Sequence, residues 1–419
     1  MRSILVALIL IAGAMSCTEN ELARFTVSAG EHDRQDWIVS VEIRPMDPEL
    51  ASDVDADLEA LAVLYEITPE EEVPVPFQLD FAGGTDVIRF MIEGITEKGT
   101  TREYILKMKR GSAADLPPVA TVQQDEDALL VADEGNPVLS YRISEIMPPE
   151  GVDSIYRRSA YIHPFYSPGG MVLTRIQPPD HYHHYGIWNP WTKTHINDRE
   201  IDYWNLRKGE GTVRTEALLA TEEGPVATSF TALQQHIDKG YEAGERLTID
   251  EFWDVKYWGK TADGNRYILD LYTTLRNVLQ DTIIFDAYRY GGGLGYRATA
   301  EWNNENSSIL TSEGKDRATA DGTRARWCIV EGESSVEEGR SGILFMSHPD
   351  NREHPEPMRV WPPDAGHGNV FFEFCPIRYK EWKILPGMDY RLQYRMVVYD
   401  GELTAEEADR YWNAFAYPD

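Results

Sequence analysis

The chain has 419 residues, and its 40 Lys plus Arg against 70 Asp plus Glu give a formal net charge of −30. A field of that sign repels nucleic acid and anionic lipid headgroups, so we exclude nucleic acid as a partner. The length allows two or three domains and a sizeable hydrophobic core.

Residues 1–17 have the features of a targeting segment. Arg2 supplies a positive start, and Ile4–Ala14 form an apolar run too short to span a bilayer. The run Ala14-Met15-Ser16-Cys17 resembles the processing box of bacterial lipoproteins, which predicts a lipoprotein signal peptide with Cys17 as the lipidation site. An ordinary signal peptide cleaved nearby is the alternative.

Thr18 follows the cysteine where retention at the inner membrane would favour Asp. By its resemblance to Gram-negative lipoproteins, the chain is therefore expected at the outer membrane, with its domains in the periplasm or at the cell surface. No other stretch is apolar enough to cross a bilayer, so we expect contact with the membrane only through the N-terminal lipid anchor.

Residues 24–110 contain short strand-like runs separated by turns. The predicted strands include Phe25–Val27, Trp37–Ile43, Leu61–Ile67, Val87–Ile92 and Tyr104–Met108. Strands of this length over about 90 residues are typical of a small immunoglobulin-like β-sandwich. Residues 111–118, which end in Pro117-Pro118, are the predicted linker.

Residues 119–402 continue the strand signal with almost no helical periodicity. The predicted strands include Leu129–Val131, Val138–Ile143, Met171–Ile176, Tyr267–Leu275, Ile343–Met346 and Tyr390–Tyr399. Many short strands with few helices indicate a large two-sheet β-sandwich, so the whole chain is expected to be mainly β.

Residues 403–419 are predicted to form a C-terminal helix. Thr404-Ala405-Glu406-Glu407 is a capping box, in which the first and last side chains satisfy backbone N–H groups at the start of a helix. Ala408, Tyr411, Trp412 and Phe415 follow at helical spacing and form one apolar face.

The densest candidate site is Asp180-His181-Tyr182-His183-His184-Tyr185-Gly186-Ile187-Trp188. Imidazole exchanges protons near neutral pH and is the commonest metal ligand. If the run is extended, His181, His183 and Tyr185 share one face, with Tyr182 and His184 on the other. Clustered titratable groups favour a functional site. The alternative is a strand end with hydrogen-bonded, partly buried histidines.

Two further candidates follow the first along the chain. In Tyr290–Arg297, three glycines let the backbone approach a ligand or form a bulge that directs Tyr296 and Arg297. The planar fork of Arg297 suits a carboxylate or a sugar hydroxyl. The run His348–Arg352 leaves a strand at Pro349, so His348, Asn351 and Arg352 stand where binding groups are common. A plain turn is the alternative for the glycine run.

His163 precedes Pro164, which holds its backbone extended, and is a candidate third imidazole. Cys328 and Cys375 lie in apolar strand-like runs, and they either pair in an oxidising periplasm or remain buried thiols. Aromatic rings near the histidines are candidates for stacking on sugar faces, while some are ordinary core: Tyr182, Tyr185, Trp188, Trp191, Tyr203 and Trp204.

Several runs together resemble the PmoA-like family of bacterial cell-envelope proteins, also labelled methane oxygenase. They are Arg158–Pro164, Asp180–Trp188, Tyr290–Arg297 and His348–Arg352. The resemblance covers about residues 119–402 and implies a fold similar to the supersandwich of sugar mutarotases and polysaccharide lyases, in proteins that commonly occur with carbohydrate-degrading enzymes. We reject methane oxidation, because that enzyme crosses the membrane and this chain has no spanning helix.

Our first functional hypothesis is a cell-envelope enzyme acting on carbohydrate as a hydrolase, lyase or epimerase. In an acid/base version, His181 or His183 transfers a proton, Asp180 or Glu373 orients it, and Arg297 stabilises negative charge. Substrate contacts are assigned to Asp180, His184, Tyr185, Trp188, Tyr296, Asn351 and Arg352.

A metal version leaves open a divalent ion held by His181 and His183 with His163 or His348. No cofactor is otherwise expected. The second hypothesis is a non-catalytic glycan-binding lipoprotein, and the third is a structural envelope protein. An enzyme requires His181, His183 and at least one of His163, Arg297 or His348 around one pocket. A carbohydrate or another small molecule is the expected partner, and the oligomeric state is left open.

Overall fold

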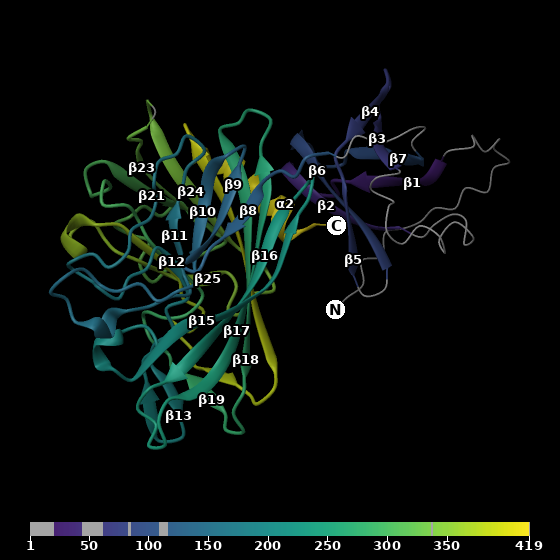
Figure 1. Cartoon of the computed structure of the whole chain (residues 1–419). Helices are drawn as coiled ribbons and strands as arrows, with labels where there is room; N and C mark the ends of the chain where they lie inside the picture. The colour runs from purple at the N-terminus through teal and green to yellow at the C-terminus, as the bar shows by residue number, and fades with distance from the viewer. Residues whose placement is uncertain (1–20, 44–61, 83–84, 109–115, 337, 419) are drawn as a thin grey trace. The chain divides into compact units, whose positions relative to one another are not determined.

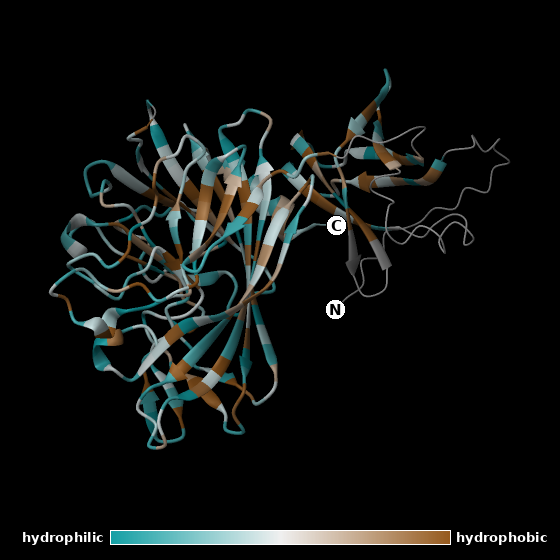
Figure 2. Ribbon diagram, in the orientation of Figure 1, coloured by the Kyte–Doolittle hydropathy of each residue, from teal (hydrophilic) through white to brown (hydrophobic). Residues whose placement is uncertain are grey.

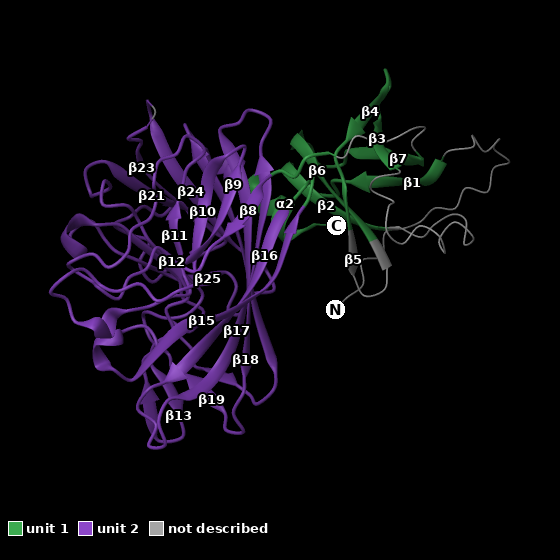
Figure 3. Cartoon of the chain, viewed as in Figure 1, with its two compact units in different colours: residues 1–119, 224–227, 409–419 green, residues 120–223, 228–408 purple. Residues whose placement is uncertain are grey.

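The computed structural model describes residues 21–43, 62–82, 85–108, 116–336 and 338–418. The predicted signal peptide, including Cys17, and most of the predicted linker lie outside these residues. The chain divides into two units, residues 1–119, 224–227 and 409–419 against residues 120–223 and 228–408 (Figure 3). Both units are mainly β, as the sequence predicts.

Unit 1 contains two small antiparallel sheets. The first has the strand order β1 (Glu21–Ser28), β7 (Thr101–Met108), β3 (Ala62–Ile67), β4 (Glu72–Val75), and the second β2 (Arg34–Ile43), β6 (Thr85–Thr96), β5 (Gln78–Ala82). In β1, Phe25 and Val27 are buried while Thr26 and Ser28 are exposed, the alternation of a strand with one face in a core.

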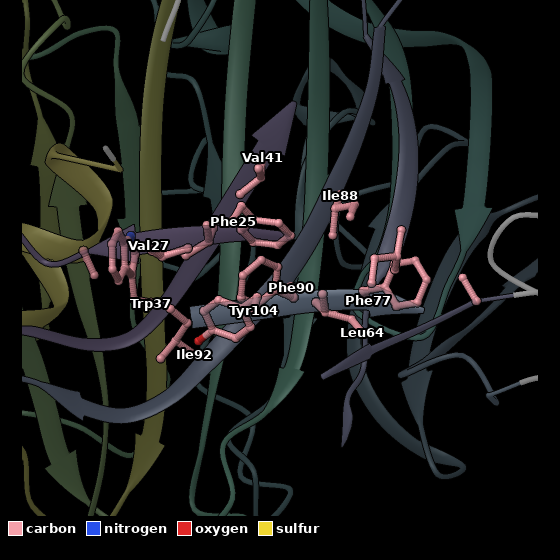
Figure 4. Close-up of a cluster of buried hydrophobic side chains, with 14 residues drawn as sticks. Phe25, Val27, Trp37, Val41, Leu64, Phe77, Ile88, Phe90, Ile92 and Tyr104 are labelled. Atoms are coloured by element: carbon pink, nitrogen blue, oxygen red, sulfur yellow. The ribbon is translucent and has the colours of Figure 1, made fainter. Parts of the chain in front are cut away.

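The two sheets of unit 1 bury a single aromatic and aliphatic core (Figure 4). Tyr104 of β7 contacts Phe90 of β6, with ring centroids 4.8 Å apart, and Phe25 stacks on Tyr104 at 5.6 Å. Trp37 of β2 belongs to the same core. Because side chains from both sheets meet in it, this region is a two-layer sandwich, in agreement with the prediction.

Unit 2 is built on two large antiparallel sheets (Figure 1). The eight-stranded sheet has the order β15 (Gly211–Glu223), β16 (Thr228–Asp238), β17 (Arg246–Lys260), β18 (Arg266–Asn277), β28 (Asp389–Asp400), β24 (Arg340–Ser347), β23 (Trp327–Glu333), β21 (Ser307–Thr311). The nine-stranded sheet has the order β22 (Arg324–Ala325), β25 (Glu356–Val360), β26 (Phe371–Phe374), β20 (Leu294–Arg297), β12 (Ile187–Trp188), β11 (Ile162–Phe165), β10 (Asn136–Arg142), β9 (Ala128–Asp133), β8 (Thr121–Gln124). Figure 2 shows hydrophobic residues recurring along these strands.

The sandwich core of unit 2 forms where these two sheets face each other. Phe345 of β24 contacts Tyr296 of β20 and Phe372 of β26, with centroids 5.0 and 4.9 Å apart. Phe374 of β26 stacks on Tyr394 of β28 at 5.7 Å. Tyr296, Phe372 and Phe374 therefore point toward the eight-stranded sheet, and their neighbours in the chain point to the opposite face.

A third, four-stranded sheet lies in unit 2 with the order β14 (Arg199–Ile201), β13 (Thr194–Ile196), β19 (Ile283–Phe285), β27 (Trp382–Ile384). Short 3₁₀ helices occur at η1 (Ser154–Tyr156), η2 (Leu206–Lys208) and η3 (Gly366–Gly368). The predicted strand Met171–Ile176 forms only isolated bridges, such as Thr174 to Ala298.

The predicted C-terminal helix is α2 (Ala405–Ala416), and its capping box is confirmed. The Thr404 N–H donates to Glu407 Oε2 at 2.9 Å, and the Glu407 N–H donates back to Thr404 Oγ1 at 3.2 Å. None of the helices that the structure describes is long and apolar enough to cross a membrane. Cys328 and Cys375 are both buried free thiols, which answers the question that the sequence left open.

Candidate functional site

The histidine-rich run forms the loop of a hairpin. Ile176 and Tyr185 form a β-bridge, and the Gln177 N–H donates to the His184 carbonyl at 2.8 Å. Inside the loop, the His181 N–H bonds the Pro178 carbonyl and the His184 N–H bonds the His181 carbonyl. The expectation of an extended run with alternating faces is therefore wrong. Prolines 178 and 179 carry no N–H for a strand ladder, and the loop closes on its own backbone.

Because the loop turns back on itself, its three imidazoles gather. The ring centroids of His181 and His183 are 5.4 Å apart, those of His181 and His184 4.7 Å, and those of His183 and His184 4.9 Å. An extended strand would have put His184 on the far face from the other two. The turn thus concentrates titratable groups more closely than the sequence predicted.

Asp180 joins the loop to the sheet beneath it. Its Oδ2 accepts a bond from Arg297 Nη2 at 2.6 Å and one from His181 Nδ1 at 3.0 Å. The Arg297 side chain is 0% exposed, that of Asp180 15% and that of His181 32%. The buried Arg297 guanidinium thus bonds the Asp180 carboxylate. The same carboxylate bonds the His181 imidazole, which solvent can reach.

The strand pleat explains why Arg297 points to this site. Its neighbour Tyr296 faces the sandwich core, so Arg297 faces away from it. Phe371 of β26 pairs with Arg297, and Trp188 of β12 pairs with Gly295, so both lie on the same outer face. The loops that cover this face bring in Trp204 and Trp361.

Aromatic rings form a wall around the imidazoles. Trp361 lies 4.9 Å from His181 and 5.6 Å from His184, between ring centroids. His184 also contacts Trp188, Trp204 and Phe371 at 5.4, 5.5 and 5.1 Å. Trp204 Nε1 donates to the His183 carbonyl at 3.0 Å and fixes the loop in place. His184 is only 1% exposed, so it belongs to the wall, whereas His181 stands at its open side.

Burial sets the charge of these groups. Burial, with smaller electrostatic contributions from the neighbouring His181 and Arg297, lowers the pKa of His183 to about 4, and burial lowers the pKa of His184 well below its usual value. Burial alone would raise the pKa of Asp180, but the hydrogen bonds of His181 and Arg297 and the charge of Arg297 outweigh it, and the pKa is lowered. At neutral pH, His183 and His184 are therefore uncharged and Asp180 is a carboxylate.

Three candidates from nearby strands point elsewhere. His163 adjoins the site, since its Cβ lies 3.0 Å from the position that a Cβ on Gly186 would take. Its ring is turned elsewhere, because its Nδ1 bonds Thr174 Oγ1 at 2.9 Å. The Tyr296 hydroxyl donates to the Leu173 carbonyl on the core side. Tyr185 is fully buried, and its hydroxyl donates to the Tyr156 carbonyl.

The run His348–Arg352 belongs to a different network. Asn351 Nδ2 donates to Glu356 Oε1 and to the Gln393 carbonyl, both at 2.8 Å. Arg352 donates to the Glu381 carbonyl at 2.7 Å and lies over Trp382. His348 follows β24 and its N–H bonds the Gln393 carbonyl. None of the contacts described for these residues reaches the histidine loop.

Glu373, the alternative orienting acid, faces the triple-glycine run. It is fully buried, and its Oε1 accepts the Gly291 N–H at 2.6 Å. A Cβ on Gly292 would lie 2.0 Å from the Trp191 ring, and one on Gly293 would lie 2.2 Å from the Phe374 carbonyl. The glycines therefore make room for the protein's own packing, and they do not open the backbone to a ligand.

Two residues of the site were not predicted from the sequence, Trp361 and Arg175. Trp361 follows β25 and directly precedes Pro362-Pro363, a weak signal for a loop residue with a fixed backbone. The Arg175 N–H bonds the Arg297 carbonyl at 3.2 Å, so the two arginines are backbone neighbours. In the described part of the chain, no group of three or more His, Cys, Asp or Glu side chains is arranged to hold a metal ion.

A family model described as a family of unknown function (DUF6807) matches residues 128–413. The matched residues contain the whole site. No curated protein matches this chain. The model does not carry the PmoA-like description, so that resemblance stays a prediction.

Solved structures similar to this chain include three carbohydrate-related proteins. Heparan sulfate lyase HepC from Pedobacter heparinus is 9% identical with a TM-score of 0.31, over 71% of this chain and 38% of the lyase. A glycosyl hydrolase family 38 protein from Enterococcus faecalis is 10% identical with a TM-score of 0.41, over 94% and 47%. A galactose mutarotase related enzyme from Lactobacillus acidophilus is 10% identical with a TM-score of 0.32, over 67% and 97%. This chain thus spans less than half of the first two proteins, and at these scores the likeness adds no argument about its activity.

Proposed function

Because the chain belongs to the family of unknown function DUF6807, we propose its activity from the site itself: a carbohydrate-active enzyme whose proton transfers run through His181. The observation that carries the proposal is the chain of contacts from buried Arg297 through Asp180 to half-exposed His181. The broad class is a hydrolase, lyase or epimerase.

The Asp180 carboxylate fixes the tautomer of His181. As a carboxylate it only accepts hydrogen bonds, so His181 Nδ1 carries the proton and donates at 3.0 Å. The Nε2 lone pair is then left to take a proton from a hydroxyl, a C–H or a water. Asp180 stabilises the imidazolium that forms, and the same proton is later returned as acid.

His183 supplies a second, uncharged imidazole beside the first. Its pKa of about 4 keeps it neutral at physiological pH, so it donates or accepts a hydrogen bond without adding charge. Tyr290 is partly exposed and lies 5.2 Å from Trp204 of the wall, and Tyr182 of the loop is partly exposed as well. An apolar ring face with a polar tip suits a saccharide.

The test is a glycan panel with product detection by chromatography. Purified protein from residue 18 onward is compared with His181→Ala and with the matched control His195→Ala. His195 is a similarly exposed histidine that also bonds an aspartate, Asp286, outside the site. We expect turnover of at least one glycan by the parent and by H195A, and a loss of about 10²-fold or more in H181A. Equal turnover by both variants would overturn the proposal.

A non-catalytic glycan-binding lipoprotein is the second candidate. The feature that favours it is the partly exposed ring of Tyr290 beside Trp204, since an aromatic platform alone is enough for glycan binding. Binding without turnover of any glycan in the panel, unchanged in H181A, would favour this candidate over the enzyme.

We also propose that Cys17 anchors the chain to the outer membrane, with a carbohydrate as its partner in the envelope. The support is the sequence Ala14-Met15-Ser16-Cys17. Expression of the full chain with labelled palmitate should label the protein and place it in the outer-membrane fraction. Labelling that persists in Cys17→Ala would contradict the anchor.

A further inference from the structure

The arginines beneath the histidine loop outnumber the carboxylates that bond them. Arg297 bonds Asp180, and Arg175 lies within electrostatic reach of both Asp180 and Arg297. In the described part of the chain, Asp180 is the sole carboxylate bonded to either arginine. Since His183 and His184 are neutral, Arg175, Arg297 and Asp180 together carry one excess positive charge. The whole chain has a net charge of −30.

The guanidinium groups also have N–H groups without partners. Arg175 Nε and Nη2, and Arg297 Nε and Nη1, are buried and make no hydrogen bond in the described structure. A buried donor left without a partner costs about 1–3 kcal/mol. These four buried N–H donors, on two arginines that are backbone neighbours, therefore lack a hydrogen-bond acceptor within the described chain.

The geometry of the free donors indicates the kind of acceptor. Nε and Nη2 lie on one edge of a guanidinium and donate in parallel, which matches the two oxygens of a carboxylate. Arg175 as a whole is partly exposed, although its two free donors are buried. One excess positive charge is balanced by one carboxylate.

We propose that the substrate is a sugar acid, a uronate whose carboxylate binds Arg175 and Arg297 while its ring lies against His181. The inference rests on the proposed function, since it names the substrate class of the same site. It also assigns Arg175 as a specificity-determining residue. Arg297 binds Asp180 with one donor and directs its remaining donors toward the ligand.

The experiment compares two probes with the same sugar rings, one with free carboxylates and one with uncharged methyl esters. Trigalacturonic acid and its methyl ester are titrated into the protein by calorimetry at fixed salt, with galactotriose as a neutral reference. For the parent protein we expect the free acid to bind at least 10-fold more tightly than the ester. In Arg175→Gln that preference should fall below about 2-fold, and in Arg175→Lys it should fall only in part, because the charge remains and the fork is lost.

Arg276→Gln is the matched control. It removes the same charge from an exposed arginine on β18 that bonds Asp389, and it should keep the full preference. Melting temperatures of all variants are measured alongside to exclude unfolding. If the acid and ester bind equally to the parent, if neither binds, or if R175Q keeps the preference, the uronate assignment is wrong.

Two further arms separate the alternatives. Acetate and inorganic phosphate are titrated alone. Phosphate that competes with trigalacturonic acid and binds at least as tightly as the acid would indicate a general anion site and overturn the assignment. His181→Ala should retain the preference for the acid while losing turnover. A preference for the acid together with full turnover by H181A would leave the uronate site standing and remove the proposed catalytic role.

Discussion

In the part of the chain that the structure describes, two partly exposed histidines share a hydrogen bond with an aspartate side chain, and the two pairs differ in what surrounds them. His181 bonds Asp180 in the hairpin loop, and His195 of β13 bonds Asp286, which follows β19. The histidine side chains are 32% and 34% exposed. In the described part of the chain, only the first pair is bonded by an arginine and ringed by further imidazoles and a tryptophan.

The difference between the two pairs shows how a functional site differs from an isolated Asp–His contact. Two strands bring His195 and Asp286 together, and strand pairing alone explains their contact, since His195 lies opposite Ile284. The contact of His181 with Asp180 instead depends on a loop held by Trp204 and on a buried cation, Arg297. A hydrogen-bonded Asp–His pair is common chemistry, and its surroundings decide whether its proton is used.

The largest expected difference is in turnover. Asp180→Asn removes the charge that stabilises the imidazolium and favours the wrong tautomer of His181, so kcat/KM should fall about 10²- to 10⁴-fold. Asp286→Asn makes the same chemical change in the other pair and should leave kcat/KM within about 2-fold. Initial rates on the glycan identified by the panel give kcat/KM for both variants. Equal losses of kcat/KM in the two variants would show that the two pairs do not differ in function.

The second difference is in stability. Asp180→Ala leaves the Arg297 guanidinium buried without its carboxylate, and we expect it to lower the free energy of unfolding by about 3 kcal/mol. Asp286→Ala breaks a solvent-screened pair and should cost less than about 1 kcal/mol. Urea unfolding of both variants measures the two costs. A cost for D180A as small as that for D286A would mean that Asp180 does not compensate a buried charge.

The smallest difference is in pH dependence and concerns the neutral imidazole beside the first pair. The pKa of His183 is about 4 in the fold, against about 6.5 in an unfolded chain. Between these values the unfolded state binds more protons, so stability is lost as the pH falls. His183 alone should cost about 2 kcal/mol at pH 5.

His183→Gln removes this contribution, and the variant should lose less stability than the parent between pH 7.5 and pH 5. Urea unfolding at both values measures it. At pH 8 the difference between variant and parent serves as the reference, because His183 of the parent is neutral there in both the folded and the unfolded state. Parallel pH curves for variant and parent would show that His183 is not held neutral by burial.

Local patterns in the sequence predicted the elements well. The alternation in residues 390–399 gave strand β28, and the capping box at Thr404 gave α2, because both depend on near neighbours in the chain. The grouping of His181 and His183 with Arg297 was also expected. The turn that gathers all three histidines was not expected, because Pro178-Pro179 interrupt an extended ladder before the histidines begin.

The remaining features of the site depend on contacts between distant segments. His163 of β11 and Arg297 of β20 lie in the two strands that flank β12 in the nine-stranded sheet, yet the His163 ring bonds Thr174 and not the site. Trp361 lies 180 positions from His181 and meets it only because β25, β26, β20 and β12 are neighbours in the sheet. Strand order of this kind leaves no trace in local sequence.

The most direct test of the site is a crystal structure of Asp180→Asn with trigalacturonic acid, since we expect that variant to bind without turning the sugar over. The expected result is a uronate carboxylate on Arg175 and a sugar atom within about 3.2 Å of His181 Nε2, the reach of a general base. Sugar bound beside His195 and Asp286, or anywhere away from the histidine loop, would contradict the assignment of His181 as the catalytic group.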